Sequence, residues 1–215
     1  MNEQTEMNEL LFPDHRELVD LGRYAVRAKS VDESGAMRLQ SAGTALAAYV
    51  CVLPGSGLMG EGTVLGLRVV ALAEPATVDV TVPLGAITDR VARDAAARAL
   101  PVPPTRVRVP WAALSPPRSG WERVGVVSSE DVAAAAREGI AAVAEGAPQG
   151  SGGHAVTALR ALTWRSLTTT APAFASGGAF AAYALGFLVP GSEVTVFEHG
   201  RWTRLTTAAG HVLIR

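Results

Sequence analysis

A proline-rich stretch in the middle of the chain constrains the fold more than any other feature. Six of the residues from 101 to 120 are proline. Proline lacks a backbone N–H and disfavours helix in the residue before it, so no long helix can cross this stretch. Val107, Trp111 and Leu114 lie within it and favour burial. We therefore interpret it as an ordered segment that crosses between two lobes, and not as a disordered linker.

The patterns before and after this stretch predict different local structure. Before it, a helix is followed by β-rich sequence, strict alternation over Thr77–Val82 and a second helix from Leu84 to Leu100. After it come three helices and a three-stranded β-meander. We expect an α+β fold in which a small antiparallel or mixed sheet with flanking helices precedes a winged-helix-like C-terminal lobe. The expected parts are a flexible tail, an N-terminal α/β lobe, the crossing segment and a C-terminal helical lobe ending in the meander, at residues 1–13, 14–100, 101–120 and 121–215, and together they can form one domain.

The third helix of the C-terminal lobe bears on nucleic-acid binding. Residues Ala179–Leu188 contain no Arg, Lys, Asn or Gln. A helix that reads the major groove presents polar side chains to base edges, whereas an apolar helix of this kind is built to be buried. The net charge of −1 also gives no general attraction to polyanions. We therefore expect no nucleic-acid partner.

Composition indicates the cellular setting. Of the 19 basic residues only Lys29 is lysine, which is typical of codon bias in a high-GC bacterium. Cys51 is the single cysteine, so no internal disulfide forms, and its apolar neighbours predict a core position. The first residues are polar and no apolar run reaches the length of a membrane span. We expect a soluble cytoplasmic protein without a membrane partner.

A glycine-rich loop follows the second predicted strand region. Gly55-Ser56-Gly57-Leu58-Met59-Gly60 matches the glycine spacing of a dinucleotide fingerprint. That fingerprint needs a helix to begin inside the motif, whereas here another strand is predicted from Thr63. A glycine-rich loop that joins two strands is the favoured interpretation, and the alternative is a ligand loop whose bare N–H groups hold an anion. The ligand-binding candidates are Gly55, Ser56, Gly57 and Gly60.

A second cluster of candidates lies around the end of the proline-rich stretch. Tryptophan and arginine together are typical of the anchors of protein interfaces. The alternative is that the tryptophans fill the core and an arginine sits at a turn. The partner-binding candidates are Trp111, Arg118, Trp121 and Arg123.

The four histidines show no metal-binding spacing, so we expect no metal and no cofactor. The sequence contains no complete catalytic constellation and leaves open whether the protein is an enzyme. We favour a non-catalytic binding or scaffolding protein whose partner is another protein or a second copy of the chain. The alternative is a small-molecule enzyme with a pocket near the loop at 54–62.

Overall fold

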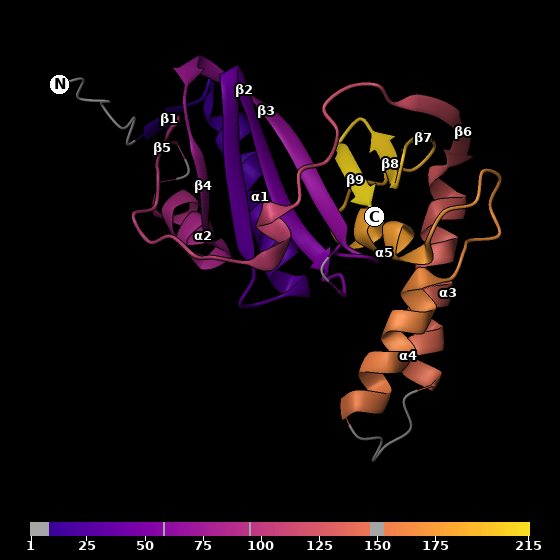
Figure 1. Ribbon diagram of the computed structural model, residues 1–215. Helices are drawn as coiled ribbons and strands as arrows, with labels where there is room; N and C mark the ends of the chain where they lie inside the picture. The colour runs from indigo at the N-terminus through magenta and orange to yellow at the C-terminus, as the bar shows by residue number, and fades with distance from the viewer. Residues whose placement is uncertain (1–8, 58, 95, 147–152) are drawn as a thin grey trace. The chain divides into compact units, whose positions relative to one another are not determined.

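The computed structural model describes residues 9–57, 59–94, 96–146 and 153–215 (Figure 1). The chain divides into two compact units. Unit 1 comprises the chain up to Val50 together with Leu67–Ala113, and unit 2 comprises Cys51–Gly66 together with Leu114–Arg215. The expected α+β class is confirmed: antiparallel strands and helices occur in both units.

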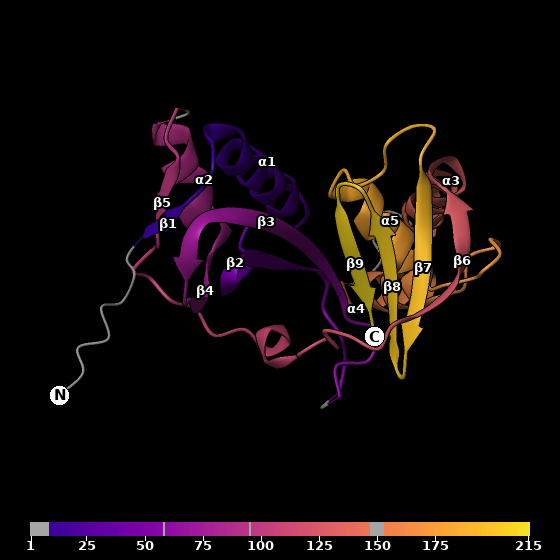
Figure 2. The same ribbon diagram turned by 90° about the horizontal axis from the view of Figure 1, so that it is seen from above.

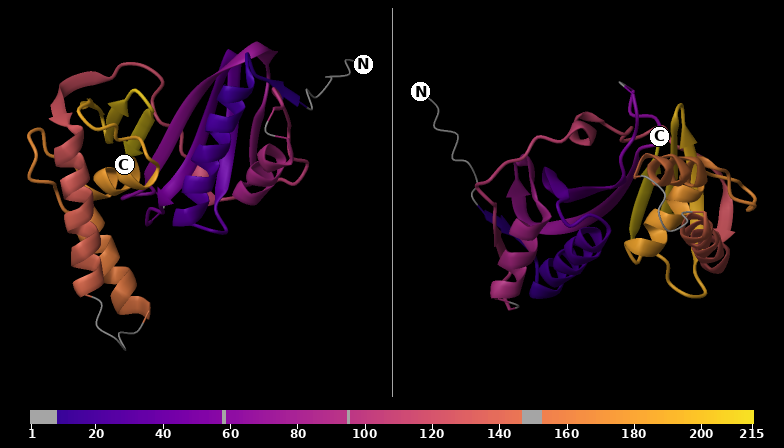
Figure 3. Two further views of the ribbon diagram at one scale, coloured as in Figure 1. Left: turned by 180° about the vertical axis from the view of Figure 1, so that it is seen from behind. Right: turned by 90° about the horizontal axis from the view of Figure 1, so that it is seen from below.

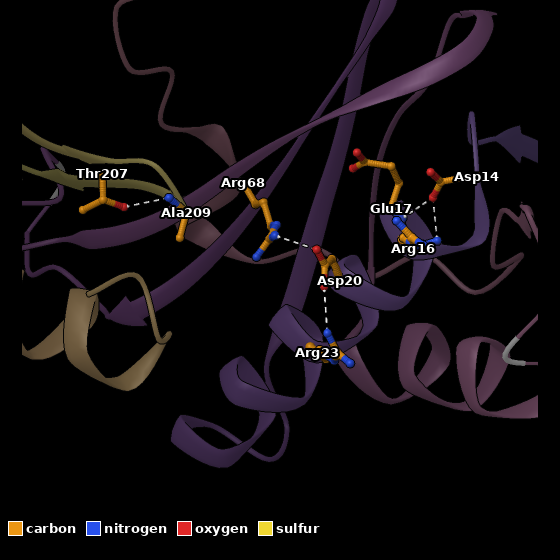
Figure 4. Close-up of polar contacts among 8 residues, drawn as sticks. All are labelled: Asp14, Arg16, Glu17, Asp20, Arg23, Arg68, Thr207 and Ala209. Carbon is orange, nitrogen blue, oxygen red and sulfur yellow. Dashed lines mark hydrogen bonds and ion pairs between the residues drawn. The ribbon is translucent and has the colours of Figure 1, made fainter. Parts of the chain in front are cut away.

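Helix α1 (His15–Val31) opens unit 1 after a short strand, β1 (Glu9–Leu11). The Asp14 side chain accepts hydrogen bonds from the N–H groups of Arg16 and Glu17, at 2.7 and 3.3 Å, so it caps the helix as its sequence predicts (Figure 4). Strand β1 pairs with β5 (Ala99–Pro101), so residues expected in a flexible tail are part of a small sheet.

The main sheet of unit 1 contains two long strands. Its order is β4-β2-β3, and α1 and α2 cover one face (Figure 2). Strand β4 pairs antiparallel with the first residues of β2, from Ala36 opposite Pro83 to Gln40 opposite Asp79. The elements are β2 (Ala36–Leu53), β3 (Val64–Ala76), β4 (Asp79–Pro83) and α2 (Leu84–Arg93).

Three expectations about unit 1 and about β2, the strand that continues from unit 1 into unit 2, are corrected. Helix α2 stops at Arg93, because Asp94 is extended (φ −146°, ψ 101°), and does not reach Leu100. Residues 105–109 form no strand, although the Val107 N–H donates to the Thr81 carbonyl at 2.9 Å. Cys51 is only partly buried, because the fully buried positions of this part of β2 are the even-numbered ones and Cys51 has the opposite parity.

Unit 2 places its helices on one face of an antiparallel sheet. The ends of β2 and β3 lead into the order β9-β8-β7-β6, and the helices pack behind these strands (Figure 2). Helices α3 and α4 lie side by side as an antiparallel pair, with Trp164 against Gly139 (Figure 3). The elements are β6 (Glu122–Ser128), α3 (Ser129–Glu145), α4 (Gly153–Arg165), α5 (Ser176–Ala184), β7 (Glu193–His199), β8 (Trp202–Thr207) and β9 (Gly210–Ile214).

Helix α5 is at the centre of unit 2. Ala179, Ala181 and Ala182 are fully buried. The helix begins three residues before the expected start and ends at Ala184, because Gly186 has a left-handed φ of +71° that terminates it. Three helices followed by a meander are present as expected, but β6 adds a strand beside β7 that the sequence did not predict. The winged-helix likeness stays a prediction.

No helix in the described part of the chain is both long and apolar enough to cross a membrane.

Candidate functional site

The sheet of unit 2 carries an aromatic and basic surface on the face that turns away from α3 and α5. Alternation on β7 sends Val194 and Val196 into the core and therefore sends Phe197 and His199 to this outer face. The register pairs Phe197 with Arg204 on β8, so both side chains occupy the same face. We call Trp121, Arg123, Phe197, His199 and Arg204 the tryptophan–arginine cluster.

Arg204 lies at the centre of this cluster. Its guanidinium carbon is 4.6 Å from the centroid of the Trp121 ring and 4.4 Å from that of Phe197. Such stacking suits the planar, weakly hydrated guanidinium group. Trp121 is held in turn by a 2.9 Å hydrogen bond from its Nε1 to the Pro117 carbonyl, and His199 meets it edge-on at 5.9 Å between centroids.

The stacking leaves part of the Arg204 guanidinium without a hydrogen-bond acceptor. Its Nε is buried and has no acceptor among the described residues. Burial lowers the pKa of Arg204. Burial also lowers the pKa of His211, and the charge of Arg204 adds to that shift. A buried donor without a partner is costly, and most buried polar groups in proteins are paired.

The structure brings together only part of the predicted partner-binding set. Trp121 stacks on Arg204, and Arg123 lies opposite Phe197 in the β6–β7 register. Arg118 is exposed before the cluster, and Trp111 belongs to a short 3₁₀ helix (Pro110–Ala113) of unit 1. Sequence reasoning did not find Phe197, His199 and Arg204. The alternation of the predicted meander strands was the available signal, but the pairing register is needed to join them.

The glycine-rich candidates form the tip of the β2–β3 hairpin. Ser56 and Glu61 exchange backbone hydrogen bonds of 2.9 and 3.0 Å, and no helix begins in the motif. Gly57 and Gly60 have φ values of +67° and +64°, which side chains rarely adopt, so the tight turn explains these glycines. The Nη2 of Arg165 donates to Ser56 Oγ at 2.5 Å and to the Glu61 carbonyl at 3.3 Å.

A cavity of about 350 Å³ lies beside this hairpin tip within unit 2. Residues Glu61 and Gly62 form one side, and Arg165 lines it from the end of α4. The tip is tied to β9, because the Gly62 N–H donates to the Arg215 carbonyl at 2.7 Å and the Arg215 N–H to Thr63 at 3.0 Å. None of the four predicted ligand-binding residues lines the cavity itself. Ser56 acts only indirectly, because it accepts a hydrogen bond from Arg165, which does line the cavity.

No group of three histidine, cysteine, aspartate or glutamate side chains in the described ranges is arranged to hold a metal ion.

The architecture defines an α+β protein built from antiparallel sheets with helices on one face. Residues 5–113 match the family described as Domain of unknown function (DUF8010), and the chain belongs to this family. Residues 116–215 match a second family, Domain of unknown function (DUF8185). The two matches meet at the proline-rich stretch.

Comparison with solved structures shows a likeness to the DNA polymerase III beta subunit from Thermotoga maritima. The TM-score is 0.51 at 15% sequence identity, over 96% of this chain and 64% of that one. The chain therefore spans less than two thirds of the length of that structure. At this identity the likeness shows the fold alone. None of the curated proteins matches the chain.

Proposed function

We propose that this protein is a non-catalytic binding or scaffolding protein that contacts a protein partner, or a second copy of itself, through the tryptophan–arginine cluster. The observation that carries the proposal is Arg204, stacked between Trp121 and Phe197 with a buried Nε that has no acceptor among the described residues. Tryptophan and arginine are the side chains that most often contribute large shares of binding energy at interfaces.

Rigidity of the cluster supports this proposal. Trp121 is fixed by its bond to Pro117, and Arg204 is fixed by two rings, so little side-chain freedom is left to lose on binding. Side chains that are ordered before binding reduce the entropic cost of association. Arg123 on the neighbouring strand extends the positive charge of the surface. The partner surface would then be acidic or rich in carbonyl acceptors.

The test compares Trp121→Ala with Trp111→Ala, a matched loss of one indole from unit 1. Sedimentation velocity over a range of concentrations measures self-association, and a photo-crosslinking residue in place of Arg123 reports other protein partners in the native host. The proposal predicts that Trp121→Ala abolishes the association or the adduct and that Trp111→Ala retains it. A chain that stays monomeric and yields no adduct at position 123 would contradict it.

A second candidate function is a small-molecule enzyme, and the cavity beside the hairpin tip favours it. Glu61 and Glu198 line that cavity and are the acid–base groups that such chemistry would use. The test is turnover of a panel of ester and phosphoester substrates by the wild type and by Glu61→Gln. Turnover that Glu61→Gln abolishes without loss of folding would support an enzyme.

Two further expectations stay proposals, namely the cytoplasmic location and the lack of a nucleic-acid partner. The comparison gives the latter no support, because the similar structure is a subunit of a DNA polymerase. The apolar character of α5 is what motivates it. Tight, sequence-dependent retardation of duplex DNA at physiological salt would exclude the proposal.

A further inference from the structure

The cavity beside the hairpin tip has an unusual balance of charge. Three arginines line it, from three different elements: Arg165 at the end of α4, Arg201 in the β7–β8 turn and Arg215 after β9. The carboxylates that face the same space are Glu61 and Glu198. None of these five side chains forms an ion pair with any residue that the structure describes. Three guanidinium groups and two carboxylates therefore line the cavity without an ion pair to any described residue.

The arginines keep free hydrogen-bond donors. The two N–H groups of Arg165 Nη2 have acceptors in Ser56 and Glu61, which leaves the donors on Nε and Nη1 without a partner among the described residues. Arg201 makes no side-chain hydrogen bond to any residue in the described ranges. Arg215 stacks over Trp202 at 5.3 Å, and its buried Nε likewise has no acceptor there. A guanidinium group matches the geometry of phosphate and carboxylate oxygens.

The rest of the cavity wall is apolar. Trp164, Phe174 and Ile214 contribute buried side chains to it. Leu167 also lines the cavity, although 71% of it is exposed, so an uncovered apolar side chain borders the space. Sites for small molecules combine an apolar wall with a few convergent polar groups in this way, and a volume of about 350 Å³ is within their range.

We infer that this cavity binds a small ligand that carries an oxyanion head, phosphoryl or carboxylate, on an apolar body. Arg201 and Arg165 bind the head and the apolar wall accepts the body. The hydrogen bond from Arg165 to Ser56 positions that guanidinium before the ligand arrives. Glu198 faces the same space and opposes the anion. The inference goes beyond the partner binding proposed above and does not depend on it, since Arg165 and Arg201 are not members of the tryptophan–arginine cluster.

The experiment is calorimetric titration of the whole protein with two probes, phenyl phosphate and benzoate, which separate the two sources of the oxyanion. Arg201→Ala should weaken binding about tenfold, the usual effect of losing a charged hydrogen bond. Glu198→Gln should strengthen binding, because it removes a repulsive charge. Arg160→Ala is the matched control: Arg160 is exposed on α4 and does not line the cavity, so binding should be unchanged.

Binding of either probe with these opposite effects supports the inference, and the stronger probe identifies the head group. Absence of heat with both probes at millimolar concentration overturns it, as does binding that Arg201→Ala leaves unaltered. Arg201 is at an exposed turn, so its replacement should leave the fold intact, and thermal unfolding of each variant verifies this. Loss of binding in Trp121→Ala would instead locate the ligand at the tryptophan–arginine cluster and would also overturn the cavity assignment.

Discussion

The two units use arginine in different ways. The three ion pairs within the described residues all lie in unit 1, where Asp20 meets both Arg23 and Arg68 (Figure 4) and Arg38 holds Asp79. The four arginine–aromatic contacts in the same described ranges all lie in unit 2. A guanidinium group that faces a carboxylate has its charge satisfied within the fold. One that lies on a ring, such as Arg204 or Arg215, faces no carboxylate in the described residues.

The largest effect should come from the core of unit 2. Phe187 is fully buried, so Phe187→Ala should lower the free energy of unfolding by about 3–5 kcal/mol. Val189→Ala, at a half-exposed position nearby, should change it by less than about 0.5 kcal/mol. Urea unfolding followed by tryptophan fluorescence measures both. Similar midpoints for the two variants would mean that Phe187 is not a core residue.

Two helix glycines, one from each unit, should differ in the sign of their effect on the free energy of unfolding. A methyl group on Gly178 of α5 would collide with Ile214 Cδ1, so Gly178→Ala should cost about 1–3 kcal/mol. On Gly85 of α2 the nearest contact is Lys29 Nζ at 4.0 Å, so Gly85→Ala should be neutral or stabilising by about 0.5–1 kcal/mol. The same urea titrations measure both, and equal destabilisation would refute this packing difference.

Loss of a single arginine should have a smaller effect, and its dependence on salt should differ between the units. Arg38 donates to both carboxylate oxygens of Asp79, at 2.8 and 2.7 Å, and Asp79 is half exposed. Arg38→Gln should therefore cost about 1 kcal/mol or less, and added salt should reduce that cost. The cost of Arg204→Gln should be insensitive to salt, because Arg204 contacts rings. Parallel salt dependence of the two variants would contradict the comparison.

The smallest expected effect is a change in the pKa of His211. The pKa of His211 is below its ordinary value of 6.5 because the ring is buried and Arg204 is close, so the folded state favours the neutral ring. The stability that comes from burying the neutral ring is fully present above pH 6.5, the ordinary pKa. It is lost as the pH falls through the lowered pKa of the folded state. Arg204→Gln should raise the pKa of His211, as NMR titration of the ring would show. An unchanged pKa would mean that burial alone causes the shift.

The predictable parts of the fold were those set by local chemistry. The cap at Asp14 and the strand before Pro83 follow from side chains a few residues apart. Cys51 was misplaced because its neighbours are apolar on both sides, so the sequence alone does not reveal which parity is buried. Strand β6 was missed because Glu122, Arg123 and Gly125 give it no clear alternation, and the β6–β7 register shifts at that point.

The candidate sites were less predictable than the fold, for a related reason. Trp121 and Arg123 are adjacent in sequence and were identified together, but Arg204 joins them only through the pairing of β6 with β7 and of β7 with β8. The three cavity arginines are likewise far apart in the chain. Strand register and helix packing bring these residues together, and no local sequence pattern predicts that they will be neighbours.

The hairpin formed by Cys51–Gly66 has a consequence for how such a chain can be inherited. This segment lies inside the first family match, at residues 5–113, yet structurally it belongs to unit 2. A gene rearrangement that exchanged the coding sequence after residue 113 would bring a new second half but keep the old hairpin tip. A gene fragment for residues 114–215 alone would therefore encode an incomplete unit.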